Sequence, residues 1–142
     1  RTRDTSLHRA MHRARAEAGL CKCGVYEALG GIQSCERCWL RCLAKFHTGS
    51  AENADALKAM FEAQGGRCPL TGEILVFGQN ATIDHIQPKS RGGEKSLSNV
   101  RWLSYTANMC RRDLSDDEFK SLCYNVVLQN MLNNRVEDGG HR

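Results

Sequence analysis

Four stretches of the chain are predicted to be helical from the spacing of their apolar residues and from capping signals. They are residues 4–18, 51–64, 98–111 and 115–130. Ser50 is expected to cap the second stretch, and Gly65-Gly66 to end it. Ser115 and Glu118 form a capping box at the start of the fourth. Its apolar side chains are expected to pack back on the rest of the domain: Phe119, Leu122, Val126 and Met131.

Extended structure is predicted between the second and third helices. Residues 67–74 and 75–77 resemble short extended pieces around a turn at Thr71-Gly72, and residues 81–83 lead as a strand into Asp84-His85. Residues 45–50 are predicted to be a linker. A small α+β fold with flanking helices follows from this order.

The length of 142 residues allows one modest domain and a small metal-stapled module. The net charge of +4 is unevenly distributed, because residues 1–50 hold nine Lys or Arg against four Asp or Glu. Basic side chains along the first predicted helix, Arg9 and Arg13 among them, are expected to contact a phosphate backbone. The alternative is a solvated amphipathic helix. No apolar run is long enough to span a membrane.

Four cysteines near the start have the spacing of a structural zinc site. A Cys-x-Cys pair is followed after eleven residues by a Cys-x-x-Cys pair: Cys21, Cys23, Cys35 and Cys38. Cys42 is an alternative ligand, and His47 a weaker one. Reduced thiols in a small core are the simpler interpretation. Disulfides are disfavoured because no secretory signal opens the chain, which predicts a cytoplasmic protein that is not secreted.

A second group of residues has the chemistry of a divalent-metal nuclease. Asp84 and Asn108 offer oxygen ligands for a hard cation, His85 can act as a base, and Asn99 can hold a loop. The intervening Gly92-Gly93 permits a tight loop. Taken singly, each of these residues is more often structural, since Asn near a helix end usually caps backbone groups.

In their order and spacing these residues resemble the His-Asn-His (HNH) family of ββα-metal endonucleases, in the phage-type variant whose last motif position is Asn. The similarity covers roughly residues 66–123. It implies a ββα-metal core in which Asp84 and Asn108 bind one Mg²⁺ or Mn²⁺. It also implies that His85 deprotonates the attacking water, and that Asn99 fixes the loop that carries His85.

The sequence thus predicts a divalent-metal-dependent DNA endonuclease that hydrolyses phosphodiester bonds. Arg111 is expected to reach the scissile phosphate, and three further cations to contact the DNA backbone: Lys89, Arg91 and Arg101. The expected division is a basic arm (1–20), a zinc module (21–49), a nuclease domain (50–134) and a frayed tail (135–142).

Two alternatives remain open at this point. One is a non-catalytic zinc-dependent DNA-binding adaptor. The other is a nuclease module that acts only within a larger phage, mobile-element or guide-directed assembly. Nicking or double-strand cutting, and a monomer or a homodimer, are equally compatible with the sequence.

Overall fold

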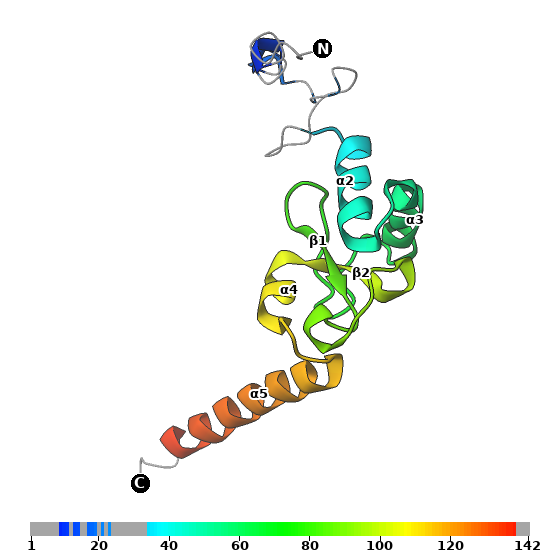
Figure 1. Ribbon diagram of the computed structural model, residues 1–142. Coiled ribbons are helices and arrows are strands. Elements are labelled where there is room, and N and C mark those ends of the chain that lie inside the picture. The colour runs from blue at the N-terminus through cyan, green and yellow to red at the C-terminus, as the bar shows by residue number, and fades with distance from the viewer. Residues whose placement is uncertain are drawn as a thin grey trace.

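The computed structural model describes residues 34–138 together with residues 9–11, 13, 14, 17–19, 21 and 23. Its main elements are two helices, a two-stranded sheet and two further helices (Figure 1). In chain order they are α2 (Glu36–Thr48), η1 (Ala51–Asn53), α3 (Ala54–Ala63), β1 (Ala81–His85), η2 (Lys89–Arg91), η3 (Leu97–Asn99), β2 (Val100–Ser104), α4 (Tyr105–Arg111) and α5 (Asp116–Asp138). The small α+β class is confirmed.

The sheet is one antiparallel pair in which β1 and β2 are joined by residues 86–99. Asp84 lies opposite Arg101, and His85 opposite Val100. On its other edge, β2 is covered by the side chain of Gln64, which accepts a hydrogen bond from the Trp102 N–H at 3.0 Å and donates one to the Trp102 carbonyl at 2.9 Å. The edge is therefore closed to further strand pairing.

The helix predicted over residues 98–111 is wrong in its first half. Residues 100–104 form β2, and only residues 105–111 are helical, with Ser104 as the N-cap whose hydroxyl accepts from the Ala107 N–H at 3.3 Å. The apolar run of β2 is buried on both sides, so its residues do not alternate as a half-exposed strand would. This burial explains why periodicity favoured a helix.

The extended pieces predicted over residues 67–77 are confirmed only in part. That segment makes a single bridge, between Arg67 and Ile74, and is otherwise turns and loops. The strands of the ββα unit are instead β1 and β2, and its helix is α4.

α2 and α3 supply the other half of the core. Leu40, Ala44 and Leu57 belong to the same buried cluster as the β2 residues, and Trp102 is fully buried with its indole N–H donating to the Leu57 carbonyl at 2.8 Å. The helix predicted over residues 51–64 is confirmed as η1 and α3, and the Ser50 hydroxyl accepts from the Glu52 N–H at 3.2 Å.

The predicted linker at residues 45–50 is mostly helix, because α2 continues to Thr48. It ends at Gly49, which has φ 85° and so occupies the left-handed region that glycine adopts without strain. The Thr48 hydroxyl donates to the Ala44 carbonyl at 2.7 Å and closes the last turn. α2 therefore carries Cys35 as its N-cap and His47 in its last turn.

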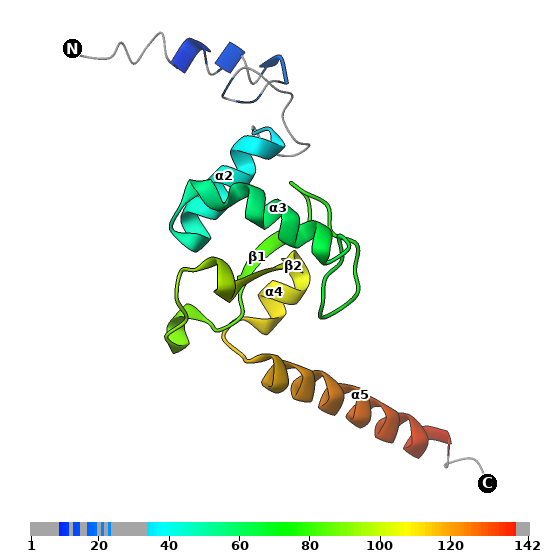
Figure 2. The same cartoon turned by 90° about the vertical axis from the view of Figure 1, so that its right-hand side faces the viewer.

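α5 projects from the domain in both views (Figures 1 and 2). The capping box at its start is confirmed, since the Glu118 N–H donates to the Ser115 hydroxyl and the Ser115 N–H to the Glu118 carboxylate. The expected packing is wrong for Leu122, Val126 and Met131, which are all more than half exposed, whereas Phe119 is half-buried. The helix also continues to Asp138 and thus through half of the predicted tail.

Candidate active site

A cleft of about 230 Å³ opens at the end of β1. Three elements and the loop after β1 contribute its walls, because the antiparallel hairpin brings β1 beside α4 while α2 packs against β1. The lining residues are His47, Ile83, Asp84, His85, Pro88, Lys89, Ser90, Asn108, Arg112 and Asp113. This volume is smaller than that of an ordinary organic-ligand pocket, and it suits a phosphate group with a cation.

Asp84 is 5 % exposed and lies between two guanidinium groups. One carboxylate oxygen accepts from Arg101 Nε at 3.0 Å and the other from Arg111 Nη1 at 2.9 Å. Burial raises the pKa of Asp84, although the charges of Arg111 and Arg101 act in the opposite direction. Both carboxylate oxygens keep lone pairs free, because a carboxylate offers about four acceptor positions.

Asp116, at the start of α5, completes this group of charges. Its carboxylate accepts two hydrogen bonds from Arg101 at 2.6 Å and one from Arg111 at 3.0 Å. These hydrogen bonds, led by those from Arg101, lower the pKa of Asp116 to about 2. The negative charges of two carboxylates and the positive charges of two guanidinium groups therefore balance one another beneath the cleft.

The sequence predicted that Arg111 reaches the scissile phosphate, but in the structure its side chain does not reach the cleft surface. It is fully buried, and its donors are occupied by Asp84, by Asp116 and by the carbonyls of His85 and Ile86. The side chain of Arg101 is only 14 % exposed and is bound to the same two carboxylates. The two carboxylates thus hold both arginines inside the fold. In turn, the guanidinium groups offset the buried charge of Asp84, which would be costly if it were unpaired.

His85 points its ring toward the end of α2. Its Nε2 lies 3.2 Å from the carbonyl oxygen of His47, and because a carbonyl can only accept, Nε2 carries the proton. Nδ1 of the neutral ring is then unprotonated. Burial is the main cause that lowers the pKa of His85, so the ring remains neutral at neutral pH.

His47 is the cleft residue that sequence reasoning placed elsewhere, as an alternative zinc ligand. Its ring lies 5.3 Å from that of His85, and its buried Nδ1 has no hydrogen-bond partner among the described residues. Burial, followed by the charges of His85, Lys89 and Lys95, lowers the pKa of His47 to about 4. No motif marks this residue, because it joins the site only through the packing of α2 on β1.

Asn99 ties together the loop between the strands. Its Oδ1 accepts from the Gln87 N–H at 2.9 Å, while its Nδ2 donates to the carbonyls of Gln87 at 3.1 Å and of Glu94 at 2.9 Å. Gly93 lies so close to this turn that a Cβ atom would stand 1.8 Å from the Gln87 carbonyl oxygen. The loop geometry after His85 therefore depends on both residues.

Asn108 reaches the cleft from α4. Its Nδ2 donates to the Thr82 hydroxyl at 3.1 Å and to the Ile83 carbonyl at 3.4 Å. Neither bond uses Oδ1, so the amide nitrogen holds the side chain on β1, and Oδ1 has no hydrogen-bond partner among the described residues.

Residues 66–105 match the family model described as HNH endonuclease. This segment contains β1, the loop held by Asn99, and β2, and thus most of the ββα unit that forms the cleft. The chain carries an HNH domain. No curated protein and no solved structure matches the chain. Within the described part of the chain, no helix has the length and apolar character needed to cross a membrane.

The match to the HNH family ends before Asn108, so the phage-type variant with a final Asn stays a prediction. α2 precedes the matched residues, yet it supplies His47 to the cleft. One wall of the cleft therefore lies outside the residues that match the HNH family model.

Four other predicted cations differ in position and partners. Lys89 is exposed and lines the cleft, whereas Arg91 is half exposed and pairs with Glu118 at 2.8 Å. Arg9 and Arg13 are exposed and helical, but most of the predicted arm around them lies outside the described residues. Of these four cations, Lys89 is the one that lines the cleft in the described part of the chain.

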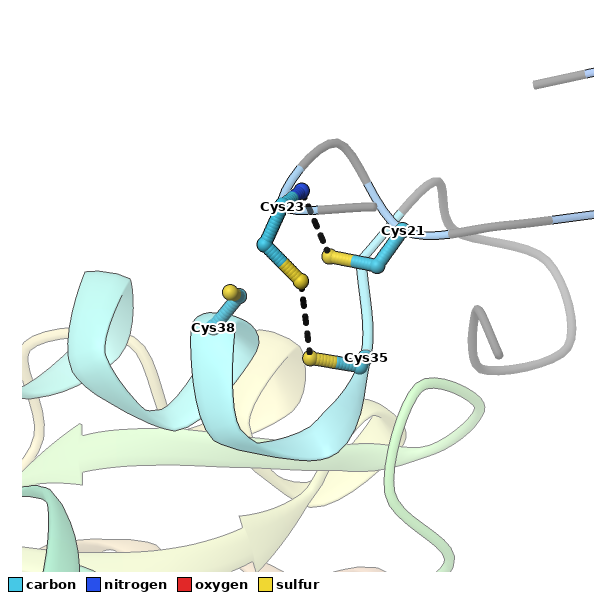
Figure 3. A group of neighbouring side chains, drawn as sticks. All are labelled: Cys21, Cys23, Cys35 and Cys38. Carbon is cyan, nitrogen blue, oxygen red and sulfur yellow. Dashed lines mark hydrogen bonds between the residues drawn. The ribbon is translucent and has the colours of Figure 1, made fainter. Parts of the chain in front are cut away.

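The four predicted zinc ligands come together at the start of α2 (Figure 3). The sulfur atoms of Cys21, Cys23, Cys35 and Cys38 all lie within 4.8 Å of one another, a grouping that suits tetrahedral zinc. Cys42 is exposed and outside this group, and His47 is at the other end of α2. Neither alternative ligand therefore joins the cluster.

Two thiols of the cysteine cluster have pKa values shifted in opposite directions. Burial acts to raise the pKa of Cys21, but hydrogen bonds from the backbone of Cys23 and Cys35 outweigh it and lower the pKa to about 6. Burial and the neighbouring sulfurs raise the pKa of Cys38 to about 12. A bound zinc ion would relieve this crowding, because it binds thiolates and stabilises their negative charge.

Proposed function

We propose that this chain is a divalent-metal-dependent DNA endonuclease, and that the cleft at the end of β1 is its active site. The observation that carries this proposal is the position of His85 in an HNH domain. Its Nε2 is anchored on the His47 carbonyl, and the cleft also holds Asp84 and Asn108 from two different elements.

Asp84 and Asn108 are the residues that would hold the cation. They offer a carboxylate and a free amide oxygen, the hard donors that Mg²⁺ and Mn²⁺ prefer. When bound, such a cation stabilises the charge that develops on the phosphate oxygens during hydrolysis.

Charge balance at Asp84 suggests that the substrate takes part in cation binding. Arg101 and Arg111 already offset the charges of Asp84 and Asp116, so a divalent cation adds positive charge to a balanced group. A DNA phosphate in the cleft supplies the missing negative charge. We therefore expect metal affinity to be higher with DNA bound than without it.

His85 is the proposed general base. Its Nδ1 takes a proton from water as the water oxygen attacks phosphorus, and the bond to the 3′-oxygen breaks with its electron pair staying on that oxygen. The proton on Nε2 stays there, hydrogen-bonded to the His47 carbonyl, which fixes the ring and stabilises the imidazolium that forms.

Two residues position these groups without touching substrate. Asn99 holds the turn that follows His85, and Arg111 holds the Asp84 carboxylate together with the carbonyls of His85 and Ile86. Arg111 thus sets the end of β1, from which both the base and the metal ligand project.

The cysteine cluster is proposed to hold one structural zinc ion. Four thiolates close the coordination sphere and leave no position for substrate, so this ion would stabilise the start of α2 and not take part in hydrolysis.

The test is cleavage of supercoiled plasmid by the purified chain with added Mg²⁺ or Mn²⁺. His85→Ala is expected to lower the rate by about 10²- to 10⁴-fold, the range that loss of a general base produces. Asn125→Ala, on the exposed face of α5, is the control and should cut as the wild type does. Unchanged cleavage by His85→Ala would remove the proposed base.

Binding of DNA by the wild type without any cleavage would favour a different function. It would point to a DNA-binding adaptor, or to a nuclease that needs a partner to become active. Addition of partner proteins from the same source would then distinguish these two cases.

A further inference from the structure

Phe46 is an unusual residue to find on the surface beside the proposed active site. It lies in the last turn of α2, directly before His47, and it is 61 % exposed. Its ring meets that of His47 edge-on at 4.9 Å, and the His47 ring lies 5.3 Å from that of His85. Only one ring therefore separates Phe46 from the proposed general base.

Cations surround this exposed ring. The ammonium of Lys89 lies 4.9 Å from the ring centroid and that of Lys95 lies 5.3 Å from it. Arg41 and Lys45 line a shallow hollow on the same side of α2, and no carboxylate is among the described residues that line it. We call Arg41, Lys45, Phe46, Lys89 and Lys95 the Phe46 surface.

Packing does not account for Phe46. The aromatic cluster of the core is built from Trp39, Phe61, Phe77 and Trp102, and it does not include this ring. A large apolar side chain that stays exposed contributes little to the stability of the fold. A flat ring flanked by cations is instead the combination that binds single-stranded nucleic acid.

We propose that the Phe46 surface binds an unpaired nucleotide of the DNA strand that enters the cleft, with its base stacked on Phe46 and its phosphates on the lysines. This inference rests on the proposed function and specifies its substrate class. In a closed duplex the faces of the bases are stacked on one another, so only an unpaired base can use the ring. DNA with a flap, bubble or branch next to the scissile phosphate is then the preferred substrate.

Lys89 and Lys95 can move off the Phe46 ring when a base stacks on it. In the free protein they lie over the Phe46 ring, and their long stems let the ammonium groups move to phosphate oxygens when DNA arrives. Lys89 also lines the cleft, so the same strand can pass from the Phe46 surface to His85.

The experiment measures binding of the full chain, without added Mg²⁺, to a single-stranded oligonucleotide that contains 2-aminopurine, a base whose fluorescence falls on stacking. The same oligonucleotide annealed to its complement is the duplex probe. Phe46→Ala is expected to bind the single strand about 5- to 100-fold more weakly and to lose the quenching, with duplex affinity unchanged.

Two variants control for structure. Phe46→Trp should restore single-strand affinity and quenching. Tyr124→Ala removes an aromatic ring of similar exposure, 66 %, from α5 and should bind as the wild type does. Lys89→Ala and Lys95→Ala should each reduce the slope of log affinity against log salt by about 0.7, whereas Phe46→Ala should leave that slope as it is.

The inference is overturned if Phe46→Ala keeps the affinity and quenching of the wild type, or if the loss is equal for the single strand and the duplex. Either result can occur in a protein that cleaves plasmid normally, which leaves the proposed function standing. A wild type that binds and quenches the single strand but never cuts contradicts the proposed function and not this surface.

Discussion

The cysteine cluster and the cleft at the end of β1 are two proposed cation sites of opposite design at the two ends of one helix. α2 has 13 residues, about 20 Å of helix, with Cys35 and Cys38 at its start and His47 in its last turn. The first site is a closed set of four soft sulfur ligands, and the second is an open cleft with two hard oxygen ligands.

The two sites are expected to serve different purposes, the first stability of the fold and the second hydrolysis. A closed thiolate site contributes its binding energy to the structure, whereas an open oxygen site with few protein ligands leaves coordination positions for water and phosphate. The cleft also needs rigid support, which the buried group of Asp84, Asp116, Arg101 and Arg111 provides. Changes at either site should therefore affect stability and cleavage to very different degrees.

The largest effect on stability is expected from Cys38→Ser. Loss of one of four ligands should reduce bound zinc below one ion per chain and remove several of the about 10–16 kcal/mol that structural zinc can contribute. Zinc content and thermal unfolding are the measurements. Cys123→Ser, an exposed thiol on α5, is the control and should change neither. Full zinc content in Cys38→Ser would contradict the assigned ligand set.

A smaller but still large loss of folding stability is expected from Arg111→Met. Removal of the buried guanidinium leaves Asp84 without one of its two partners, and breaking a buried ion pair in this way costs about 3–5 kcal/mol. Urea unfolding measures the loss, and exposed Arg112→Met should stay near the wild type. Equal stability of the two variants would show that the charge group does not support β1.

The smallest effect concerns the pH dependence of stability at His47. Its pKa is about 4 in the folded chain and about 6.5 in the unfolded chain, so only the unfolded chain takes up a proton between these values. Stability should fall by about 1–3 kcal/mol as pH drops from about 6.5 to 4. His47→Gln should flatten the unfolding free energy over this range, and the same slope in both proteins would contradict the burial of His47.

The sequence predicted the two sites unequally. The four cysteines of the cluster are close in the chain, and their spacing alone predicted the grouping that the structure shows. The cleft residues Asp84 and Asn108, and Asn99 in the loop beside the cleft, were found from the order of an HNH motif, and their hydrogen bonds show how each is held. His47 and Asp116 could not be found in this way, because they reach the site only through tertiary packing.

Burial accounts for most other differences between prediction and structure. β2 was predicted as helix because it is buried on both sides, and Arg101 and Arg111 were predicted as DNA contacts although two carboxylates hold them inside. Charge along a sequence does not reveal which cations are already paired. The apolar residues of α5 were assigned to the core, yet they lie on a helix that extends away from it.

The most direct test of this account is a Mg²⁺ titration of plasmid cleavage with protein that keeps its full zinc content. Asn108→Ala removes a proposed oxygen ligand, and Asn125→Ala removes an amide from α5 as the control. The account predicts that Asn108→Ala needs at least about ten times more Mg²⁺ for half-maximal cleavage, with unchanged zinc content and only a small loss in melting temperature from its two hydrogen bonds to β1. An unchanged Mg²⁺ requirement in Asn108→Ala would contradict the cleft as the catalytic cation site.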